Sequence, residues 1–365
     1  MNQYKYKYVI DRIKQDIKRG EIVDKLPGER TIAKRLDISY MTVRKAVEML
    51  CDEGILYKLP TKGTYVNKSG NSRIKTSNIG FYLDDRIKEG ISSPYYSLVF
   101  KALDKEALKH NYNLIYFSEF EDICPADHCK KIDGLIVACF PRLENRLYEL
   151  KRLLPIVVIG NSASDKSIPS VIIDNFNGTV AAIDFLVSLG HSRIGYIAGM
   201  LDSNVGKDRK KGYESAIENH GWKIDKELIY KGDYSYLAGM KGGNYLLSLP
   251  IPPTAIVCAN DSMAIGALAA VRDKGFGVPE DMSIIGFDDI TVASQIHPPL
   301  TTIAAPITKI AKNSVNLLLS LIQERDLSAR HIALPAHLVT RYSCAENKLA
   351  SLRLSALSAF SARTA

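Results

Sequence analysis

The stretch LDISYMTVRKA, residues 36–46, predicts a tight turn followed by a helix. Asp37 and Ile38 make the turn, and Ser39 stands at the N-cap position, where its hydroxyl can accept a hydrogen bond from an otherwise unpaired backbone N–H. Apolar side chains then recur at helical spacing, at Val43, Ala46, Val47 and Leu50. One face of this helix is therefore expected to pack on a core, while the opposite face meets solvent.

The outward face of this helix carries side chains suited to binding a polyanion. At about 100° per residue, four side chains point away from the apolar stripe and two more lie on its margins. The four are Met41, Arg44, Lys45 and Glu48, and the marginal two are Tyr40 and Thr42. Arg44 can reach a guanine edge or a phosphate with its planar fork, and the hydroxyls of Ser39 and Thr42 can bond phosphates. Tyr40 could instead pack on the helix margin.

Two further helices and a hairpin surround this segment. Apolar residues at helical spacing predict one helix near the N-terminus and a second that begins near Pro27, which fits a helix start. The stretch ILYKLPTKGTYV, residues 55–66, predicts two short strands around a turn. Three helices and a basic hairpin make a winged helix-turn-helix, which we assign to residues 1–68 (the head) and which places its third helix in the major groove of DNA. Lys62 and Gly63 would let the wing approach the DNA backbone closely.

The charge distribution also indicates that the head binds a polyanion. Residues 1–75 hold 17 Lys and Arg against 9 Asp and Glu, whereas the remaining chain holds 31 of each, so the whole net charge of +8 lies in the first fifth. A small basic domain joined to a larger neutral one indicates a DNA-binding head and a body with another task. The alternative is a basic N-terminal domain with no partner.

The segment from residue 26 to residue 66 resembles the DNA-binding domain of the GntR family. The positions that match the family are Arg30, Ser39, Thr42, Arg44, Gly63 and Thr64. The chain departs from the family pattern at Gly28, where serine is usual, and at Tyr40 and Met41, where a cation is common, so base readout is expected to rely more on apolar contact. The resemblance implies DNA contacts from the third helix and the wing, although Arg30 could instead pair with a neighbouring acid. Our candidate DNA contacts are Arg30, Ser39, Tyr40, Met41, Thr42, Arg44, Lys45, Lys62, Gly63 and Thr64.

After a polar, basic linker at residues 69–77, the hydrophobic pattern changes. Short apolar runs alternate with helical stretches in two series, which predicts two lobes of parallel sheet with helices on both faces. The predicted fold class is therefore α/β: a winged helix-turn-helix domain followed by a two-lobed, parallel-sheet body over residues 78–344. Residues 345–365 form a tail that is either a tetramer-forming helix or a frayed end.

Polar side chains follow several of the predicted strands. These pairs are Asp174 and Asn175, Asn260 and Asp261, and Asp288 and Asp289. Because open parallel sheets bind ligands beyond the C-terminal ends of their strands, a cleft between two lobes would collect these side chains. Acids and amides with an arginine and aromatic rings suit polyhydroxyl ligands, since Asp accepts from hydroxyls and Arg donates in a fork. Asn175 and Asp261 could instead be helix N-caps.

Four motifs of the body resemble the effector domain of the LacI family. They are LGHSRIGYIAG (189–199), PTAIVCANDSMAIGAL (253–268), VPEDMSIIGFDD (278–289) and HPPLTTIAAP (297–306). The resemblance covers nearly the whole body and implies a periplasmic-binding-protein-like homodimer that binds a small molecule, usually a sugar, between its lobes. Carried over by motif, the candidate ligand contacts are Tyr95, Tyr96, Arg209, Tyr234, Asn260 and Asp288. One departure lies at residues 118–134, where the connection is shorter than family members usually have.

A GntR-type head on a LacI-type body is similar to the arabinose repressors of Gram-positive bacteria. The similarity implies a homodimer that binds a pseudo-palindromic DNA operator and a monosaccharide such as arabinose, without establishing which sugar. We predict a repressor of sugar-utilisation genes that the sugar releases from DNA, with a ligand-dependent activator as the alternative. A head fused to an enzyme domain is a further alternative, but the sequence has no G-x-S-x-G elbow, P-loop or H-E-x-x-H helix, so we expect no enzyme.

Composition restricts the location and the cofactors. No apolar run reaches the roughly 18 residues of a membrane span, and charges are scattered through the N-terminus, so we expect a cytoplasmic protein that binds no membrane. A transport binding protein would share the body's fold but would need export. Cys124, His128 and Cys129 could supply metal ligands, but no second ligand pair follows at a suitable distance. We therefore expect neither a metal nor another cofactor.

Overall fold

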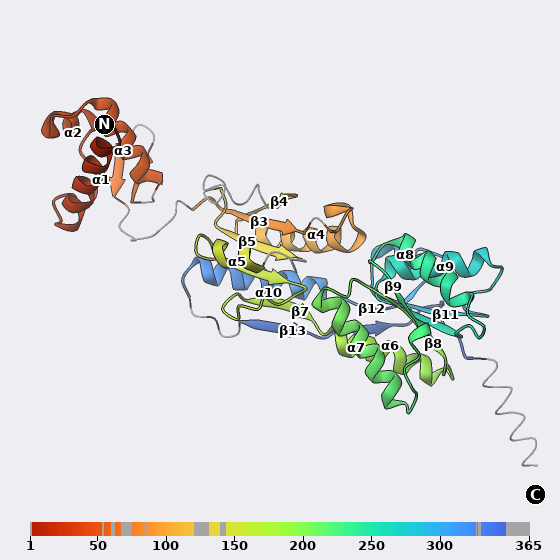
Figure 1. Cartoon of the computed structure of the whole chain (residues 1–365). Helices are drawn as coiled ribbons and strands as arrows, with labels where there is room; N and C mark the ends of the chain where they lie inside the picture. Colours follow the sequence, from red (N-terminus) through yellow and green to blue (C-terminus); the bar gives the residue numbers. More distant parts are fainter. Residues whose placement is uncertain are drawn as a thin grey trace, which may run out of the picture. The chain divides into compact units, whose positions relative to one another are not determined.

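The computed structural model describes residues 2–52, 55–59, 63–66, 75–84, 86–119, 131–138, 144–325, 327 and 330–347 (Figure 1). These residues divide into two compact units. The first holds the described residues up to Ser77 together with residues 131–133, and the second holds the others from Asn78 onward. Throughout the described part of the chain, every helix is too short or too polar to span a lipid bilayer.

Among the described residues, three helices and a hairpin form the head. The elements are α1 (Asn2–Lys18), α2 (Glu29–Leu36), α3 (Tyr40–Asp52), β1 (Leu56–Leu59) and β2 (Gly63–Val66). The apolar stripe of α3 is inaccessible to solvent at Val43, Ala46, Val47 and Leu50. It packs with Val9 and Ile13 of α1 and with Ile32 of α2 in one apolar core. The winged helix-turn-helix that the sequence predicts is confirmed.

The junction between α2 and α3 depends on Asp37 and Ser39. Asp37 ends α2 in the left-handed conformation, with φ of 52°, which a short polar side chain tolerates. The backbone N–H of Thr42 donates a hydrogen bond of 3.2 Å to Oγ of Ser39, and the hydroxyls of these two residues lie 2.8 Å apart. Ser39 therefore caps α3 and fixes the direction in which this helix leaves the turn.

The hairpin predicted for residues 55–66 is present in the described residues. Strands β1 and β2 pair antiparallel, with Leu59 opposite Gly63. Gly63 has φ of 114°, and a Cβ atom there would lie 2.9 Å from Cε of Lys25, so the position favours glycine. The turn that includes Lys62 lies outside the described residues.

The body consists of two lobes, each built around one sheet. The first lobe contains β3 (Asn78–Leu83), η1 (Gly90–Ser92), α4 (Pro94–Lys109), β4 (Asn113–Phe117), β5 (Gly134–Ala138), α5 (Glu144–Leu150), β6 (Ile156–Ile159), β7 (Ser170–Ile173), α10 (Ile307–Ile322) and β13 (His331–Leu334). The second contains α6 (Asn175–Ser188), β8 (Ile194–Ala198), α7 (Asn204–Asn219), η2 (Lys226–Leu228), β9 (Ile229–Lys231), α8 (Tyr236–Leu247), β10 (Ala255–Cys258), α9 (Asp261–Asp273), β11 (Ser283–Asp288), η3 (Thr291–Ser294), β12 (Thr301–Ala304) and β14 (His337–Val339). Strands β5, β6, β10 and β11 are buried at every position, as parallel strands covered on both faces should be.

The order of the strands confirms most of the predicted topology. Within the described residues, the first sheet runs β13-β7-β6-β5-β3-β4 and is parallel throughout, and the second runs β14-β12-β11-β10-β8-β9. The parallel sheets that the sequence predicts are confirmed, and the exception among the described strands of the body is β14, which pairs antiparallel with β12. The reason is that β14 follows β13 of the other lobe after only two residues, with no helix to reverse the chain between them.

Three segments of the described chain pass from one lobe to the other. They are residues 173–175, residues 304–307 and residues 334–337. The N–H of Asp174 donates a 2.8 Å hydrogen bond to the carbonyl of Leu334, so two of these segments are bonded to each other. Figure 1 shows α10, blue, beside the first sheet, to which the chain returns after β12.

Several predicted features lie mostly or wholly outside the described residues. They are the linker at residues 69–77, the short connection at 118–134, the candidate metal ligands Cys124, His128 and Cys129, and the tail at 345–365. These features therefore stay predictions.

Candidate ligand cleft and DNA-binding surface

Arg209, on α7 in the second lobe, is the centre of a buried polar cluster. Only 4% of this residue is exposed. Its Nε donates to Oδ1 of Asn175 at 2.8 Å, one terminal nitrogen donates to Oδ1 of Asp288 at 3.1 Å, and the other donates to the carbonyl of Ala259. The guanidinium carbon lies 3.6 Å from the ring centre of Phe287. The ring supports one face of the guanidinium plane, and the three acceptors fix its orientation.

The partners of Arg209 come from the ends of three strands. Asn175 follows β7, Ala259 follows β10 and Asp288 ends β11. Strands β10 and β11 bring their C-terminal ends to one edge of the second sheet, and β7 of the first sheet ends where the chain crosses to the second lobe, so residues distant in the sequence meet at this point. The Arg209 cluster therefore lies where the lobes face each other, and Asn175 is part of one crossing segment. The carbonyl of Asp288 accepts a 3.2 Å hydrogen bond from Ala305 of a second crossing segment.

The environment of Asp288 changes its acidity. Asp288 is only 5% exposed. Burial raises the pKa of its carboxyl group from 3.8 to about 6, although the charge of Arg209 and its hydrogen bond act to lower this pKa. The backbone of Asp288 has φ of 108°, a conformation that L-residues rarely adopt. A strained backbone of this kind persists only where the surrounding contacts hold it in place, and it is common at functional sites.

Asp261 holds the chain that follows Asp288. Its carboxylate accepts from the N–H of Ile290 at 2.8 Å and from the hydroxyl of Thr302 at 2.5 Å, and the residue has no exposed surface. Burial raises the Asp261 pKa well above 3.8, and the charge of Asp288 adds to this shift. The N-cap of the following helix, α9, is Asn260, so Asp261 is not the cap that the sequence allowed. It supports the strained turn instead.

Tyr95 of the first lobe comes near this cluster, and Tyr96 packs beside Tyr95. Tyr95 and Tyr96 lie in the first turn of α4, half-buried, with their ring centres 5.1 Å apart in an edge-to-face arrangement. Burial raises the pKa of Tyr95 above its ordinary value; Asp288 adds to the shift and Arg209 opposes it. Tyr95 therefore lies close enough to interact electrostatically with both charged groups of the second lobe. An aromatic side chain of one lobe thus lies near a charged pair of the other.

Tyr234 and Asn260 are bonded to each other beside the Arg209 cluster, since Asn260 directly follows Ala259. Nδ2 of Asn260 donates to the carbonyl of Tyr234 at 3.0 Å, while Oδ1 of Asn260 accepts from the N–H of Met263 and caps α9. Tyr234 has φ of 73°, and a Cβ atom at Gly199 would lie 2.1 Å from Cζ of its ring. Gly199 therefore makes the space that this ring occupies. The amide of Asn260 has a structural role whether or not it also contacts a ligand.

The structure adds two residues that are not among the six candidate ligand contacts. Phe287 supports Arg209, and Asn175 fixes its Nε. Asn175 carried a signal, since it follows a strand, but the sequence equally allowed it as a helix cap. In the structure Asp174 is the cap of α6, and the amide of Asn175 bonds to Arg209. Phe287 gave no signal, because an aromatic residue inside a strand is ordinarily part of a core.

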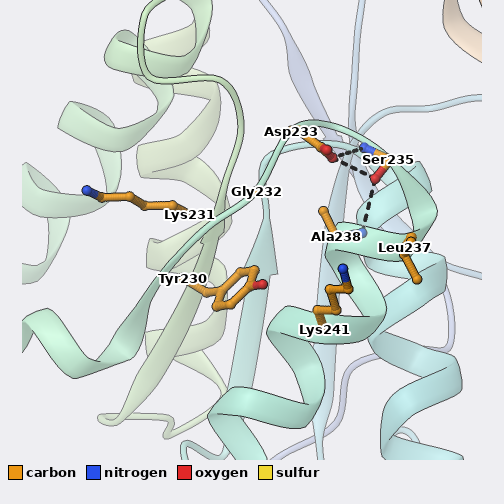
Figure 2. Close-up of a pocket in the computed structure, with 8 residues that line it drawn as sticks. All are labelled: Tyr230, Lys231, Gly232, Asp233, Ser235, Leu237, Ala238 and Lys241. Carbon is orange, nitrogen blue, oxygen red and sulfur yellow. Dashed lines mark hydrogen bonds between the residues drawn. The ribbon is translucent and has the colours of Figure 1, made fainter. Parts of the chain in front are cut away.

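A separate pocket of about 200 Å³ lies at the edge of the second lobe. Figure 2 shows it beside β9 and the start of α8, where Asp233 accepts hydrogen bonds from Ser235 and the hydroxyl of Ser235 caps α8. Its lining residues are Tyr230, Lys231, Gly232, Asp233, Ser235, Leu237, Ala238 and Lys241. None of the six candidate ligand contacts lines it. We therefore place the candidate site at Arg209 and not in this pocket.

The exposed face of α3 carries most of the candidate DNA contacts. Met41 is 67% exposed, and Lys45 and Arg44 are also on the surface. Nε of Arg44 lies 3.3 Å from Oε1 of Glu48, one turn along the helix, and both side chains are about half exposed. Exposed ion pairs at this spacing are weak, so a phosphate or a base edge can replace Glu48.

The other candidates differ in their exposure. The guanidinium of Arg30 is 5.9 Å from the ring centre of Tyr40, so α2 adds a cation next to the start of α3. Gly63 is exposed in the wing, and Thr64 beside it is half-buried. Thr42 is only 7% exposed and its hydroxyl lies against that of Ser39. This position favours a role in holding the start of α3 over the phosphate contact that the sequence suggested.

Comparisons with known families match the two parts of the chain separately. Residues 5–66 match the bacterial regulatory proteins of the gntR family, and residues 183–344 match a periplasmic binding protein-like domain. The chain is 32% identical over 316 residues to a probable HTH-type transcriptional repressor, ExuR, of Bacillus subtilis, covering 83% of this chain and 94% of that protein.

Solved structures give the same result for the body. A regulatory protein of the LacI family from Chloroflexus aggregans is 30% identical, with a TM-score of 0.65 over 74% of this chain and all of that chain. A LacI family transcriptional regulator from Enterococcus faecium, solved with bound ribose, is 26% identical, with a TM-score of 0.65 over 74% of this chain and 99% of that chain. The protein from Bacillus subtilis and the one from Enterococcus faecium are named as transcriptional regulators.

Proposed function

This chain belongs to the LacI family of transcriptional regulators and carries a GntR-type DNA-binding domain, and we propose that it is a repressor of sugar-utilisation genes that a monosaccharide releases from its operator. One observation carries the proposal: Arg209 and Asp288 form a buried, oriented pair at the strand ends, opposite Tyr95 of the other lobe. A guanidinium and a carboxylate provide fixed donors and acceptors for neighbouring hydroxyls. The related regulator with bound ribose supports a sugar as the ligand.

The cleft provides both kinds of contact that a monosaccharide needs. Hydroxyl groups would bond with Arg209 and Asp288, and the apolar face of the sugar ring would lie against the tyrosines Tyr95, Tyr96 and Tyr234. Asn260 would complete the polar side. Since these side chains come from both lobes, a ligand that contacts them all favours the closed arrangement over an open one.

On the DNA side, we propose that a homodimer places two copies of α3 on the half-sites of a pseudo-palindromic operator in the cytoplasm. Arg44, Lys45, Met41 and Tyr40 would face the major groove, and Arg30 and the wing would contact the backbone. The wing contacts would include Lys62, Gly63 and Thr64. Phosphate contacts make such binding weaken with salt, by about 0.9 log units per log of salt for each phosphate neutralised.

A thermal-shift screen of monosaccharides and sugar phosphates, with arabinose in the first set, tests the ligand class. A ligand that binds only the native state stabilises it by about 2.7 kcal/mol at 100 times its Kd. We therefore expect one sugar or a small group of stereochemically related sugars to raise the melting temperature by several degrees. If amino acids and nucleosides in the same screen raise it and no sugar does, the proposed ligand class is wrong.

Ligand affinity should fall as pH decreases through about 6, the pKa of Asp288. Below that pH the carboxyl is protonated and loses charge, so at pH 5 we expect sugar binding about tenfold weaker than at pH 7.5. The contribution of Asp288 to the stability of the ligand-free protein should change with pH in the opposite direction. Its raised pKa contributes stability that is fully present below the ordinary value of 3.8 and is lost as pH rises through about 6.

Calorimetric titrations at several pH values measure the first effect. Asp288→Asn removes the titrating group, so the variant's weaker sugar binding should no longer depend on pH in this range. An unchanged wild-type affinity between pH 5 and pH 7.5 would contradict the placement of Asp288 against the ligand.

A further inference from the structure

An ion pair joins the two lobes at Arg86. Its Nε lies 2.8 Å from Oδ1 of Asp84, which directly follows β3 of the first lobe. One terminal nitrogen of Arg86 lies 2.7 Å from Oδ2 of Asp202, in the segment between β8 and α7 of the second lobe. Both segments follow the C-terminal ends of strands, so the ion pair joins the sheet edges at which the two lobes face each other.

The two ends of this link differ in rigidity. The Asp84 side chain is 3% exposed and accepts from both the backbone N–H and the Nε of Arg86, and the Asp84 N–H donates to the carbonyl of Ala138. The guanidinium is therefore oriented from the first lobe, with 13% of the Arg86 side chain exposed. Asp202 is 55% exposed. Water can replace its side of the pair, so this bond can break while the first-lobe side stays intact.

The ion pair connects the two segments that lead into the helices of the candidate ligand site. Arg86 lies in the connection that leads to α4, the helix of Tyr95, and Asp202 directly precedes Ser203, the N-cap of α7, the helix of Arg209. We propose that Arg86 and Asp202 form a latch that holds the lobes closed in the absence of ligand and sets how readily the cleft opens. The part of this inference that concerns ligand affinity rests on the proposed function, whereas the closure itself does not.

The free energy that such an ion pair contributes determines how far the balance between closed and open molecules changes when the pair is removed. Removing one such pair should change the ratio of closed to open molecules by about two- to fivefold at low ionic strength. Because the latch favours the closed form before the ligand arrives, it should slow ligand release by this factor and raise apparent ligand affinity by at most this factor. Salt screens exposed charges, so the effect should shrink at high ionic strength.

Asp202→Asn is the most direct test. The variant loses the charge at the second lobe and leaves the Arg86 to Asp84 pair in place. Asp184→Asn is a matched control, because Asp184 is 53% exposed and its 2.8 Å partner, His220, lies in the same lobe. Fluorophores attached through non-natural amino acids at Leu108 and Phe276, exposed positions of the first and second lobes, would report the distance between the lobes by single-molecule energy transfer.

We expect the ligand-free full-length Asp202→Asn protein to populate long interlobe distances about two- to fivefold more than wild type at about 20 mM salt. The difference should largely disappear at about 0.5 M salt, where exposed charges are screened. The Asp184→Asn protein should match wild type at both. The latch is overturned if Asp202→Asn matches wild type at low salt or if both variants open equally. Since no ligand is present, failure of the sugar hypothesis leaves this result unaffected.

Discussion

Arg44→Ala is expected to weaken operator binding by about 10- to 100-fold at each half-site, while ligand affinity stays unchanged. Arg44 is on the solvent side of α3, four residues before its weak partner Glu48, so its fork is available to a guanine edge or a phosphate. The core residues on the opposite face of α3 are untouched, and the head should remain folded. Fluorescence anisotropy with a duplex enriched by the wild-type protein measures the loss.

Arg19→Ala provides the control for charge alone. Arg19 is exposed just after α1, outside α3 and the wing, and its loss lowers the head's net charge by the same amount. We expect its effect on DNA affinity to be several-fold at most, through the general field of the head. Equal losses for the two variants would mean that α3 does not read the operator, and the assignment of α3 as the recognition helix would fail.

Asp288→Asn is expected to produce a repressor that still binds DNA but is released only at much higher sugar concentrations. The substitution keeps the size of the side chain and one acceptor for Arg209 but removes the charge. Hydrogen bonds to charged groups contribute about 1.5–3 kcal/mol, so ligand affinity should fall by about 10- to 100-fold. Arg209→Ala is a poorer test, since it leaves a buried carboxylate without its partner, a change that can cost about 3–5 kcal/mol of stability.

The neighbouring Asp289→Asn variant is the matched control. Asp289 pairs with Arg341 at 2.7 Å, and its side chain is 28% exposed, so it does not belong to the Arg209 cluster. Its variant should bind sugar and release DNA nearly as the wild type does. Isothermal titration gives ligand affinity, and anisotropy gives release. If the Asp288→Asn complex dissociates at the same sugar concentration as wild type, the ligand site lies elsewhere.

The sequence was sufficient where local spacing decides the structure. The stripe Val43, Ala46 and Val47 has helical spacing, and Ser39 precedes it, so both the helix and its start could be predicted. Alternation of apolar runs with helical stretches likewise predicted two lobes of largely parallel sheet. The strand-end rule then drew attention to Asp288, which the structure places beside Arg209.

Other features depend on contacts between distant parts of the chain, and local patterns do not determine these. The antiparallel β14 and the return of α10 to the first lobe follow from where the chain crosses between lobes. The Arg86 to Asp202 pair joins residues 116 positions apart in the sequence. Thr42 lies at the edge of a helical projection, and only its contact with Ser39 decides that its hydroxyl faces the protein.

The titration of a preformed operator complex with the sugar selected by thermal shift tests the central claim most directly. Coupling between two sites typically amounts to about 1–3 kcal/mol, so saturating sugar should weaken operator affinity by about 5- to 150-fold. We predict that anisotropy falls toward the value of free DNA as sugar is added, with a midpoint that follows the measured sugar affinity. A sugar that binds the protein tightly yet leaves operator affinity unchanged would contradict a ligand-released repressor.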